Sequence, residues 1–336
     1  MKGSIGRAPL QLLRSRLVRR ALRPLLRERA SVFMLHRFRN PDLGLEGHDP
    51  AAVRAMLGFL RREGFEFMSL RALFDALLSG RPLDGAVAFT IDDGYADQAH
   101  VAGPLFAEFD CPVATFLCTG FLDGRFWMWW DRVEYALERT KRRQLDLPGI
   151  VLRWGDPSTR RAAQHRVIEH VKRLPEMEKR PYVDALAAQA EVDLPVAPPP
   201  RYAPMTWDDA RRCEERGMSF GPHTLTHAIL STADAEQSRR EIEGSRRRLA
   251  EELRSPDPVF CYPNGQADDF GERECDVLKE LGFAGAVTGL PGYAEAGREA
   301  HWPYRVARFS FTEDEIDLLQ CVSGFEQAKT MLRGRR

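Results

Sequence analysis

Short apolar runs alternate with helical patterns along most of the chain. Apolar runs of strand length predict strands at 32–35, 65–68, 86–91, 112–117, 218–221, 259–262 and 284–288. Between several of them, apolar positions at helical spacing predict helices at 50–63, 69–78, 95–109, 206–216, 233–254 and 270–281. Repeated strand–helix alternation implies a parallel sheet. A dinucleotide-binding fold of this class would carry Gly-x-Gly-x-x-Gly, which the chain lacks.

Residues 123–202 interrupt this alternation. The segment is rich in charged residues, helical in pattern, and ends in three prolines, 198–200. We therefore expect one α/β domain over residues 31–336 with a helical insertion at about 123–202, including a solvated surface helix over 160–190. The insertion begins with an aromatic run in which Trp129 and Trp130 suit stacking on a sugar face. The same tryptophans could instead anchor the insertion on the domain.

Residues 1–30 predict a basic amphipathic helix. Apolar residues form a stripe at helical spacing, and arginines occupy the opposite face. The stripe comprises Leu10, Leu13, Leu17, Val18, Ala21, Leu22 and Leu25, and the arginines are Arg16, Arg19, Arg20, Arg23 and Arg27. Through residues 1–29 such a helix can lie on an anionic membrane. The alternative is a helix that packs on the domain with its arginines solvated.

Neither a secretory signal nor a membrane span is recognisable in the sequence. No continuous apolar core or small-residue cleavage site follows the basic start, and no run of 18 or more apolar residues exists. The six cysteines include no Cys-x-x-Cys pair, as expected in a reducing compartment. We therefore expect a cytoplasmic protein that can be peripheral on the inner membrane surface. The net charge of zero argues against a nucleic-acid partner.

Two short motifs carry the candidate chemistry. Asp92-Asp93 ends an apolar run, and His223 and His227 are four residues apart. Asp93 and both histidines can supply three ligands to one divalent ion and leave an open coordination position, as in catalytic zinc sites. Adjacent residues at a strand end point in different directions, which leaves Asp92 beside the ion. Such an ion lowers the pKa of a bound water, and the second carboxylate can act as the base.

Each motif alone is ambiguous. Asp-Asp-Gly is a common turn sequence. The histidine pair lacks the glutamate of the zinc-protease motif, because Thr224 occupies that position. The two histidines face one way only if the chain between them makes about one helical turn. Because both motifs accompany strand-like runs, the sequence favours one shared metal site over two unrelated turns.

Three segments resemble motifs of the polysaccharide deacetylases, carbohydrate esterase family four, also called the NodB-homology domain. Residues 89–97 resemble the first motif and residues 217–227 the second. Phe260-Cys261-Tyr262-Pro263-Asn264-Gly265 resembles the third, in the form found in members from exopolysaccharide clusters. The resemblance covers about 32–308, interrupted by the insertion, and implies a distorted (β/α)7 barrel of the TIM type.

The resemblance also implies roles for the motif residues. By position, Asp92 is the general base, and Asp93, His223 and His227 bind the metal. The activity that it implies is hydrolysis of N-acetyl groups on sugars.

The C-terminal part departs from the family pattern. The family's fifth motif, Leu-x-His, supplies a histidine acid, but this chain has Trp302-Pro303-Tyr304-Arg305-Val306-Ala307-Arg308 in that region. His301 lies just before this run, out of frame. His36, at the end of the first apolar run, is the better candidate for the acid, since exopolysaccharide-type members resemble this chain there. The alternative is a capped or buried structural histidine.

The sequence therefore predicts a metal-dependent hydrolase that removes N-acetyl groups from an N-acetylated sugar, glycan or lipid-linked saccharide, with Asp92 as base and His36 as acid. An Asp-His-His set suits one zinc ion, and also cobalt, nickel or iron. Substrate contacts are expected from Tyr262, Pro263, Asn264, Trp129, Trp130 and Arg305.

Two alternatives remain open. A metal-dependent O-acetyl carbohydrate esterase would use the same residues. A non-catalytic glycan-binding protein of the same fold would typically lose Asp92 or a ligand. A phosphoesterase is disfavoured, since no dinuclear ligand set is evident in the sequence.

Overall fold

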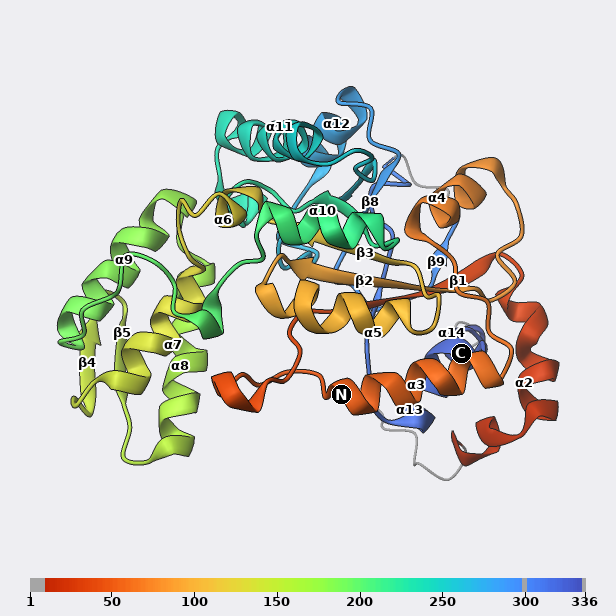
Figure 1. Cartoon of the computed structure of the whole chain (residues 1–336), viewed down its shortest axis with the longest axis horizontal. Coiled ribbons are helices and arrows are strands. Elements are labelled where there is room, and N and C mark those ends of the chain that lie inside the picture. The colour runs from red at the N-terminus through yellow and green to blue at the C-terminus, as the bar shows by residue number, and fades with distance from the viewer. Residues whose placement is uncertain (1–9, 298–300, 334–336) are drawn as a thin grey trace.

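A curved, mostly parallel sheet forms the centre of the fold (Figure 1). The structure, a computed structural model, describes residues 10–297 and 301–333. The parallel strands run in the order β10-β1-β2-β3-β6, and β9 pairs antiparallel with β1. Their bounds are β1 Arg29–Leu35, β2 Val87–Asp93, β3 Val113–Leu117, β6 Ser219–Pro222, β9 Ala294–Glu295 and β10 Phe309–Ser310. The central strands β1, β2 and β3 fall on predicted apolar runs.

A second parallel pair, β7 (Val259–Cys261) and β8 (Gly285–Val287), completes the barrel. Val287 of β8 forms a bridge with Val306, shortly before β10. On the other side, the Asp257 N–H donates to the Phe220 carbonyl of β6 at 2.7 Å. Within the described ranges β6 and β7 form no ladder, so the barrel of seven strands is distorted at this seam. The predicted α/β class and distorted (β/α)7 barrel are confirmed.

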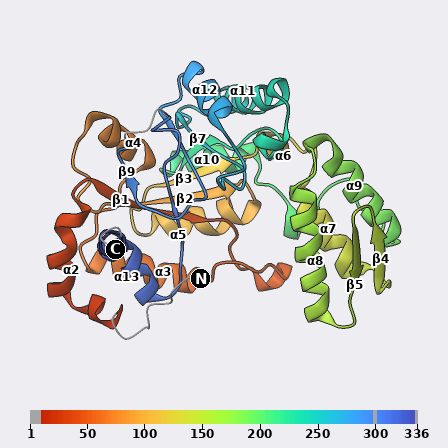
Figure 2. The same cartoon turned by 180° about the vertical axis from the view of Figure 1, so that it is seen from behind.

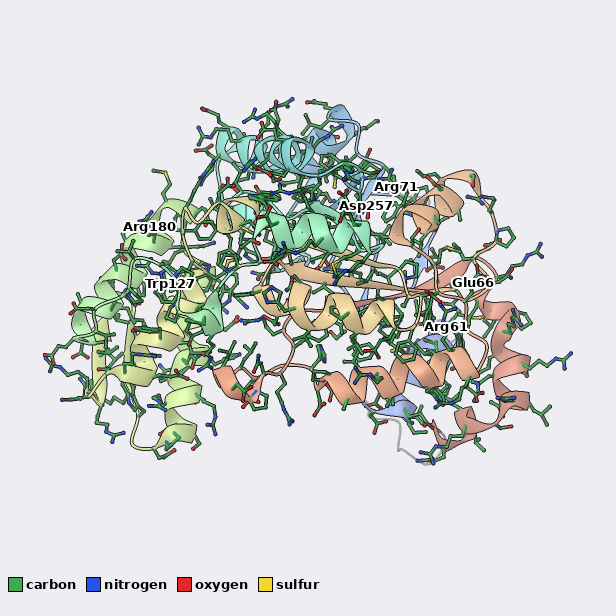
Figure 3. The ribbon with its side chains drawn as sticks, viewed as in Figure 1. Arg61, Glu66, Arg71, Trp127, Arg180 and Asp257 are labelled. Carbon is green, nitrogen blue, oxygen red and sulfur yellow. The ribbon has the colours of Figure 1, made fainter. Side chains whose placement is uncertain are left out.

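Helices surround the barrel in both views (Figures 1 and 2). They are α3 (Pro50–Arg62), α4 (Leu70–Ser79), α5 (Gly103–Ala107), α10 (Trp207–Glu215), α11 (Ala235–Glu252), α12 (Glu272–Glu280), α13 (Glu315–Val322) and α14 (Phe325–Arg333). Arg71 of α4 pairs with the buried Asp257 before β7, with Nε 3.3 Å from Oδ1 (Figure 3). Between the sheet and these helices, Phe33 of β1 stacks on Phe89 of β2, with ring centroids 5.8 Å apart.

Two predicted elements differ in the structure. The helix expected at 95–109 consists of a π-helical segment, Gln98–Ala102, followed by the short α5. The strand expected at 65–68 makes only a single bridge, from Phe67 to Val87. The reason is competition for one edge of β2, because β3 pairs with that edge from Phe89 onward.

The insertion forms a separate lobe beside the barrel (Figures 1 and 2). It contains α7 (Trp129–Arg139), β4 (Gln144–Leu147), β5 (Ile150–Arg153), α8 (Pro157–Lys172) and α9 (Glu176–Gln189). The expected single solvated helix over 160–190 is wrong: Pro175 separates α8 from α9, and both helices bury residues such as Val167 and Val183. The β4–β5 hairpin was also not foreseen. Its two-residue turn ends in Gly149, whose φ of 77° suits glycine.

The amino-terminal segment packs at the start of the barrel strands. It comprises η1 (Gln11–Arg14), α2 (Arg16–Leu22) and η2 (Arg23–Leu26). Leu10, Leu13 and Leu26 are buried, and the Arg27 carbonyl accepts the Leu83 N–H just before β2. Arg16 and Arg19 both pair with Glu63 at the end of α3. This segment therefore lies at the opposite ends of β1 and β2 from Leu35 and Asp93.

Candidate metal centre and active-site cavity

Both carboxylates of the first motif are buried at the end of β2. Asp92 still pairs within the sheet, opposite Phe116 of β3. Asp93 has a φ of 93°, a conformation that non-glycine residues rarely adopt. Such strain concentrates at functional sites, where the surrounding structure fixes it. Here it accompanies the divergence of the two side chains: Asp92 faces Arg308, and Asp93 faces the histidines.

Asp93, His223 and His227, the three predicted ligands, lie close together. Oδ1 of Asp93 lies 3.6 Å from Nε2 of His223 and 3.4 Å from Nε2 of His227. One ligand atom from each residue lies within 4.8 Å of the other two. The route differs from the expected helical turn: Thr224 and His227 have φ values of 67° and 58°, so a left-handed bend brings the imidazoles together.

Neighbouring groups orient this set for a metal ion. Nδ1 of His223 donates to the Cys261 carbonyl at 2.7 Å, which leaves the Nε2 lone pair directed at Asp93. The buried carboxylate of Glu241 accepts the N–H groups of Leu225 and Thr226 at 2.8 and 2.9 Å. One carboxylate and two correctly oriented imidazoles are the donor types of a catalytic zinc site. The three residues therefore fit a divalent ion.

Arg308 holds Asp92 away from the ligand role. Its guanidinium donates two hydrogen bonds of 2.8 Å to the two oxygens of Asp92, and Nε donates to the Thr288 carbonyl at 2.8 Å. Burial alone would raise the pKa of Asp92, but the charge and hydrogen bonds of Arg308 outweigh burial, and the pKa lies below its ordinary value. Asp92 is therefore an ionised carboxylate at neutral pH.

Asp92, His223 and Cys261 form an overlapping cluster that could also be considered for a metal ion. Two observations disfavour it. The Arg308 guanidinium lies 3.2 Å from the Cys261 sulfur, and this positive charge would repel a cation. Burial raises the pKa of the Cys261 thiol, so it stays protonated. Asp93 with both histidines is therefore the better candidate for a metal site.

His36 stands beside the base at the end of β1. Its Nε2 lies 3.9 Å from Oδ2 of Asp92, and its side chain is 50% exposed toward the cavity. His301, the other histidine considered, lies instead near α12, with Nε2 3.3 Å from Asp276. It does not line the cavity. The geometry thus places His36, and not His301, next to the candidate base.

The cavity lies between the barrel and the insertion and has a volume of about 450 Å³. The barrel contributes His36, Asp92, Asp93, His223, His227 and Asn264, among others; the insertion contributes Trp129, Trp130, Asp131, Glu134, Ile168, Lys172, Arg201 and Tyr202. Three predicted substrate-binding residues, Asn264, Trp129 and Trp130, are therefore in the cavity wall. Trp127, labelled in Figure 3, instead packs against Tyr135 and Tyr202 and serves as an anchor.

The other three predicted substrate-binding residues lie elsewhere. The Tyr262 ring stacks on Phe270 at 3.9 Å inside the core, because Tyr262 faces away from its neighbour Cys261, which contacts Asp92. Pro263 is buried and does not line the cavity. Arg305 is exposed, with its guanidinium 5.8 Å from the Phe270 ring. The expected substrate contacts from these side chains are therefore not supported.

Sequence reasoning missed two polar groups of the site. The first is Arg308, which ends the run 302–308 before β10 and was not predicted to contribute to the site. The second is the pair of Tyr95 and Asp131, in which the Tyr95 hydroxyl donates to Oδ2 of Asp131 at 2.7 Å. Burial raises the pKa of Asp131 to about 8, so this carboxyl is protonated at neutral pH. Its position after two tryptophans was the only sequence signal.

A parallel barrel whose polar residues gather at the carboxyl ends of its strands is the layout of barrel enzymes. A family model named polysaccharide deacetylase matches residues 178–286. This match, over part of the chain, agrees with the resemblance that the motifs predicted and supports the enzyme class of a carbohydrate deacetylase. The matched segment contains His223 and His227 but not Asp92 or Asp93, so the carboxylates join the site through the fold.

Solved structures show the same fold. The chain is similar to the Streptococcus pyogenes deacetylase PplD in complex with acetate, with a TM-score of 0.58, 17% identity, and coverage of 88% of this chain and 99% of that chain. It is also similar to IcaB from Ammonifex degensii, with a TM-score of 0.54, 14% identity, and coverage of 88% and 97%. At these identities the likeness concerns the fold alone. No curated protein sequence matches the chain.

Proposed function

We propose that the protein hydrolyses N-acetyl groups on an N-acetylated sugar, glycan or lipid-linked saccharide and uses one divalent metal ion, preferentially zinc. The observation that carries this proposal is that a set of metal-ligand atoms and a candidate base lie side by side in one cavity. Asp93, His223 and His227 present three ligand atoms, while Asp92 is held beside them by Arg308. Cobalt, nickel and iron would suit the same donors.

The residues can divide the reaction between them. A bound divalent ion would polarise the acetamide carbonyl and make water more acidic. Asp92 accepts a proton as water attacks the carbonyl carbon, and Arg308 keeps Asp92 ionised for this step. His36, 3.9 Å from Asp92, then donates a proton to the amide nitrogen as the C–N bond breaks. The products are acetate and the free amine on the sugar.

Two other functions use the same fold. An O-acetyl carbohydrate esterase would need the same ligands and base. A non-catalytic glycan-binding protein is disfavoured because the three ligands and the base are all present and held in position by His223–Cys261, Glu241–Thr226 and Arg308–Asp92 contacts. Substrate tests distinguish the proposed N-deacetylase from the O-acetyl esterase.

A substrate panel tests the proposal. We expect purified protein to release acetate and a primary amine from N-acetylated sugars, oligosaccharides or lipid-linked saccharides, and EDTA to abolish the release until zinc is restored. Amine release is measured by fluorescamine and acetate by an enzymatic assay. Acetate release from O-acetylated sugars only would favour the esterase. Failure on both substrate classes, with metal bound, would favour the binding protein.

The role of His36 gives a separate prediction. His36→Gln should lower amide hydrolysis by roughly 10²-fold or more, the usual worth of acid–base catalysis, because an amine leaves poorly without a proton. An activated O-acetyl ester, whose leaving group needs no proton, should lose much less activity. Metal content and thermal stability should not change. Equal losses on both substrates would contradict the acid role and leave His36 structural.

We also propose a cytoplasmic location with peripheral contact to an anionic membrane through the amino-terminal segment. Arg20, Arg23 and Arg27 are exposed and have no ion-pair partner in the described part of the chain, and Leu17 is 78% exposed beside them. The acids near this surface include Glu28, the paired Glu63, Glu66 and Asp84. Within the described residues, no helix is long and apolar enough to cross a bilayer.

Membrane contact is tested by vesicle sedimentation. Arg20→Gln/Arg23→Gln/Leu17→Gln should weaken binding to phosphatidylserine vesicles, and salt should weaken the unchanged protein's binding, because each basic residue near anionic lipid contributes about 1 kcal/mol. Arg161→Gln/Arg166→Gln on α8 removes two arginines elsewhere and is the matched control. Equal and negligible binding by all three proteins would leave only the packed helix. Because this segment lies at the opposite strand ends from the cavity, binding should leave the cavity open to solution.

A further inference from the structure

The two candidate histidine ligands are oriented by different parts of the chain. His223 is fixed from within the barrel, by its hydrogen bond to the Cys261 carbonyl. For His227, no hydrogen bond to the second ring nitrogen is found in the described ranges. Its ring instead meets the indole of Trp130 edge-to-face, with centroids 4.6 Å apart and planes at 71°. Trp130 belongs to the insertion.

Trp130 is itself held in place. Its Nε1 donates to the Tyr95 hydroxyl at 3.0 Å, and that hydroxyl donates to Asp131 at 2.7 Å. The Trp129 ring packs perpendicular to it, with centroids 5.4 Å apart. Rotation of the half-buried indole away from His227 would break its hydrogen bond to the buried Tyr95 hydroxyl, which opposes the rotation. The aromatic wall against His227 is therefore rigid.

A second contact joins the insertion to the same loop. At the start of α9, Glu176 accepts a 2.6 Å hydrogen bond from Lys179, whose side chain is only 2% exposed. Glu176 also accepts the Ile229 N–H at 3.2 Å, two residues after His227, and Lys179 donates to the Thr232 hydroxyl at 3.3 Å. Separating a buried ion pair leaves an uncompensated charge, so this contact resists opening.

The loop that carries the histidines is thus held from two sides. Glu241 of the barrel helix α11 binds Leu225 and Thr226, before His227. Glu176 and Lys179 of the insertion bind Ile229 and Thr232, after it. His227 lies between the two attachments in a left-handed conformation, and its ring rests on Trp130.

We infer that the insertion supports the metal centre: Trp130 and the Glu176–Lys179 pair are positioning residues that hold His227 in its liganding orientation. The inference rests on the proposed metal ion and adds to it a role for the insertion. A barrel without the insertion would lack these contacts to His227 and its loop. Coupling between sites is reciprocal, so a bound ion should also stabilise the insertion's contacts with the loop.

Metal affinity measured by competition with a chromophoric chelator tests the inference on the full chain. Trp130→Ala and Lys179→Met should each weaken zinc binding by about 10- to 100-fold, the usual effect of losing a group that orients a ligand. Trp130→Phe, which keeps a ring against His227, should recover most of the affinity. Arg142→Met is the matched control, because Arg142 also pairs with a glutamate of the insertion, Glu191, but neither lines the cavity nor touches the loop. Its affinity should stay within twofold of the unchanged protein.

Hydrogen exchange on the unchanged protein gives an independent readout if a variant fails to fold. Zinc should slow amide exchange at the starts of α7 and α9 more than in the β4–β5 hairpin, which belongs to the insertion but not to these contacts. Zinc affinities of folded variants within twofold of the unchanged protein, or equal zinc effects on exchange in α9 and the hairpin, would overturn the inference. A chain that binds no divalent ion at all would instead overturn the proposed function.

Discussion

His223→Ala/His227→Ala should release the divalent ion and lower deacetylation by on the order of 10³-fold or more. A catalytic ion supplies several kcal/mol of transition-state stabilisation, and each tenfold in rate corresponds to about 1.4 kcal/mol. Asp93 alone would remain as a protein ligand, which is too few to retain the ion. The result is measured as metal content by mass spectrometry and as amine release on the best substrate.

The fold should survive this double substitution. Both histidines lie beyond the end of β6, and the apolar core, centred on residues such as Phe33, Phe89 and Phe116, does not include them. Circular dichroism should therefore show unchanged helix content. His301→Ala, which removes a histidine outside the cavity, should keep both metal and activity. Stoichiometric metal in the double variant would contradict the ligand assignment.

Metal binding should weaken as the pH falls. Burial lowers the pKa of His223, but its contacts with Cys261 and Asp93 outweigh burial, and the pKa lies well above its ordinary value. A histidine that holds a proton cannot ligate, so proton and metal compete at this site. Because the pKa of His223 is raised, this competition begins at a higher pH than for a free imidazole, and chelator competition at several pH values should show zinc affinity falling already as the pH is lowered through neutrality.

The barrel was predictable because its strands are apolar on both faces. Runs such as those of β1, β2 and β3 stand out from the polar helices around them, and parallel strands need that burial. The strand β10 was not predictable, because Phe309 and Ser310 show neither apolar length nor alternation and become a strand only by pairing with Phe33 and Met34. The insertion's β4–β5 hairpin was also not predicted, because its strands are too short to stand out in the sequence.

The site was predictable where its chemistry is local in sequence. Asp92-Asp93 and His223–His227 each form a recognisable motif, and the fold only has to bring two motifs together. Arg308 was missed because its partner Asp92 is 216 residues away, and nothing local distinguishes it from Arg305. The prediction for Tyr262 was not supported because side-chain direction alternates at the end of β7. Cys261 faces Asp92, so Tyr262 faces the core.

Asp92→Asn should keep the metal ion and lower turnover by roughly 10²–10⁴-fold, the usual worth of a general base. The amide has nearly the same shape and still accepts a hydrogen bond from Arg308, but it cannot take a proton from water. The depressed pKa of Asp92 means that the carboxylate is ionised throughout the neutral range, so the unchanged enzyme should lose this base only in acid. Metal content and pH–rate profiles together measure both expectations.

Asp131→Asn is the matched comparison for this substitution. Asp131 is also a buried cavity carboxyl, but burial raises its pKa to about 8, so at neutral pH it is protonated and cannot serve as the base. Its replacement keeps an acceptor for the Tyr95 hydroxyl and should change turnover by far less than the loss of Asp92. Measuring metal content in Asp92→Asn and Asp93→Asn distinguishes which aspartate of the first motif is the ligand and which is the base. If Asp92→Asn loses the ion while Asp93→Asn keeps it, the roles are reversed, and the arginine-held carboxylate is a ligand after all.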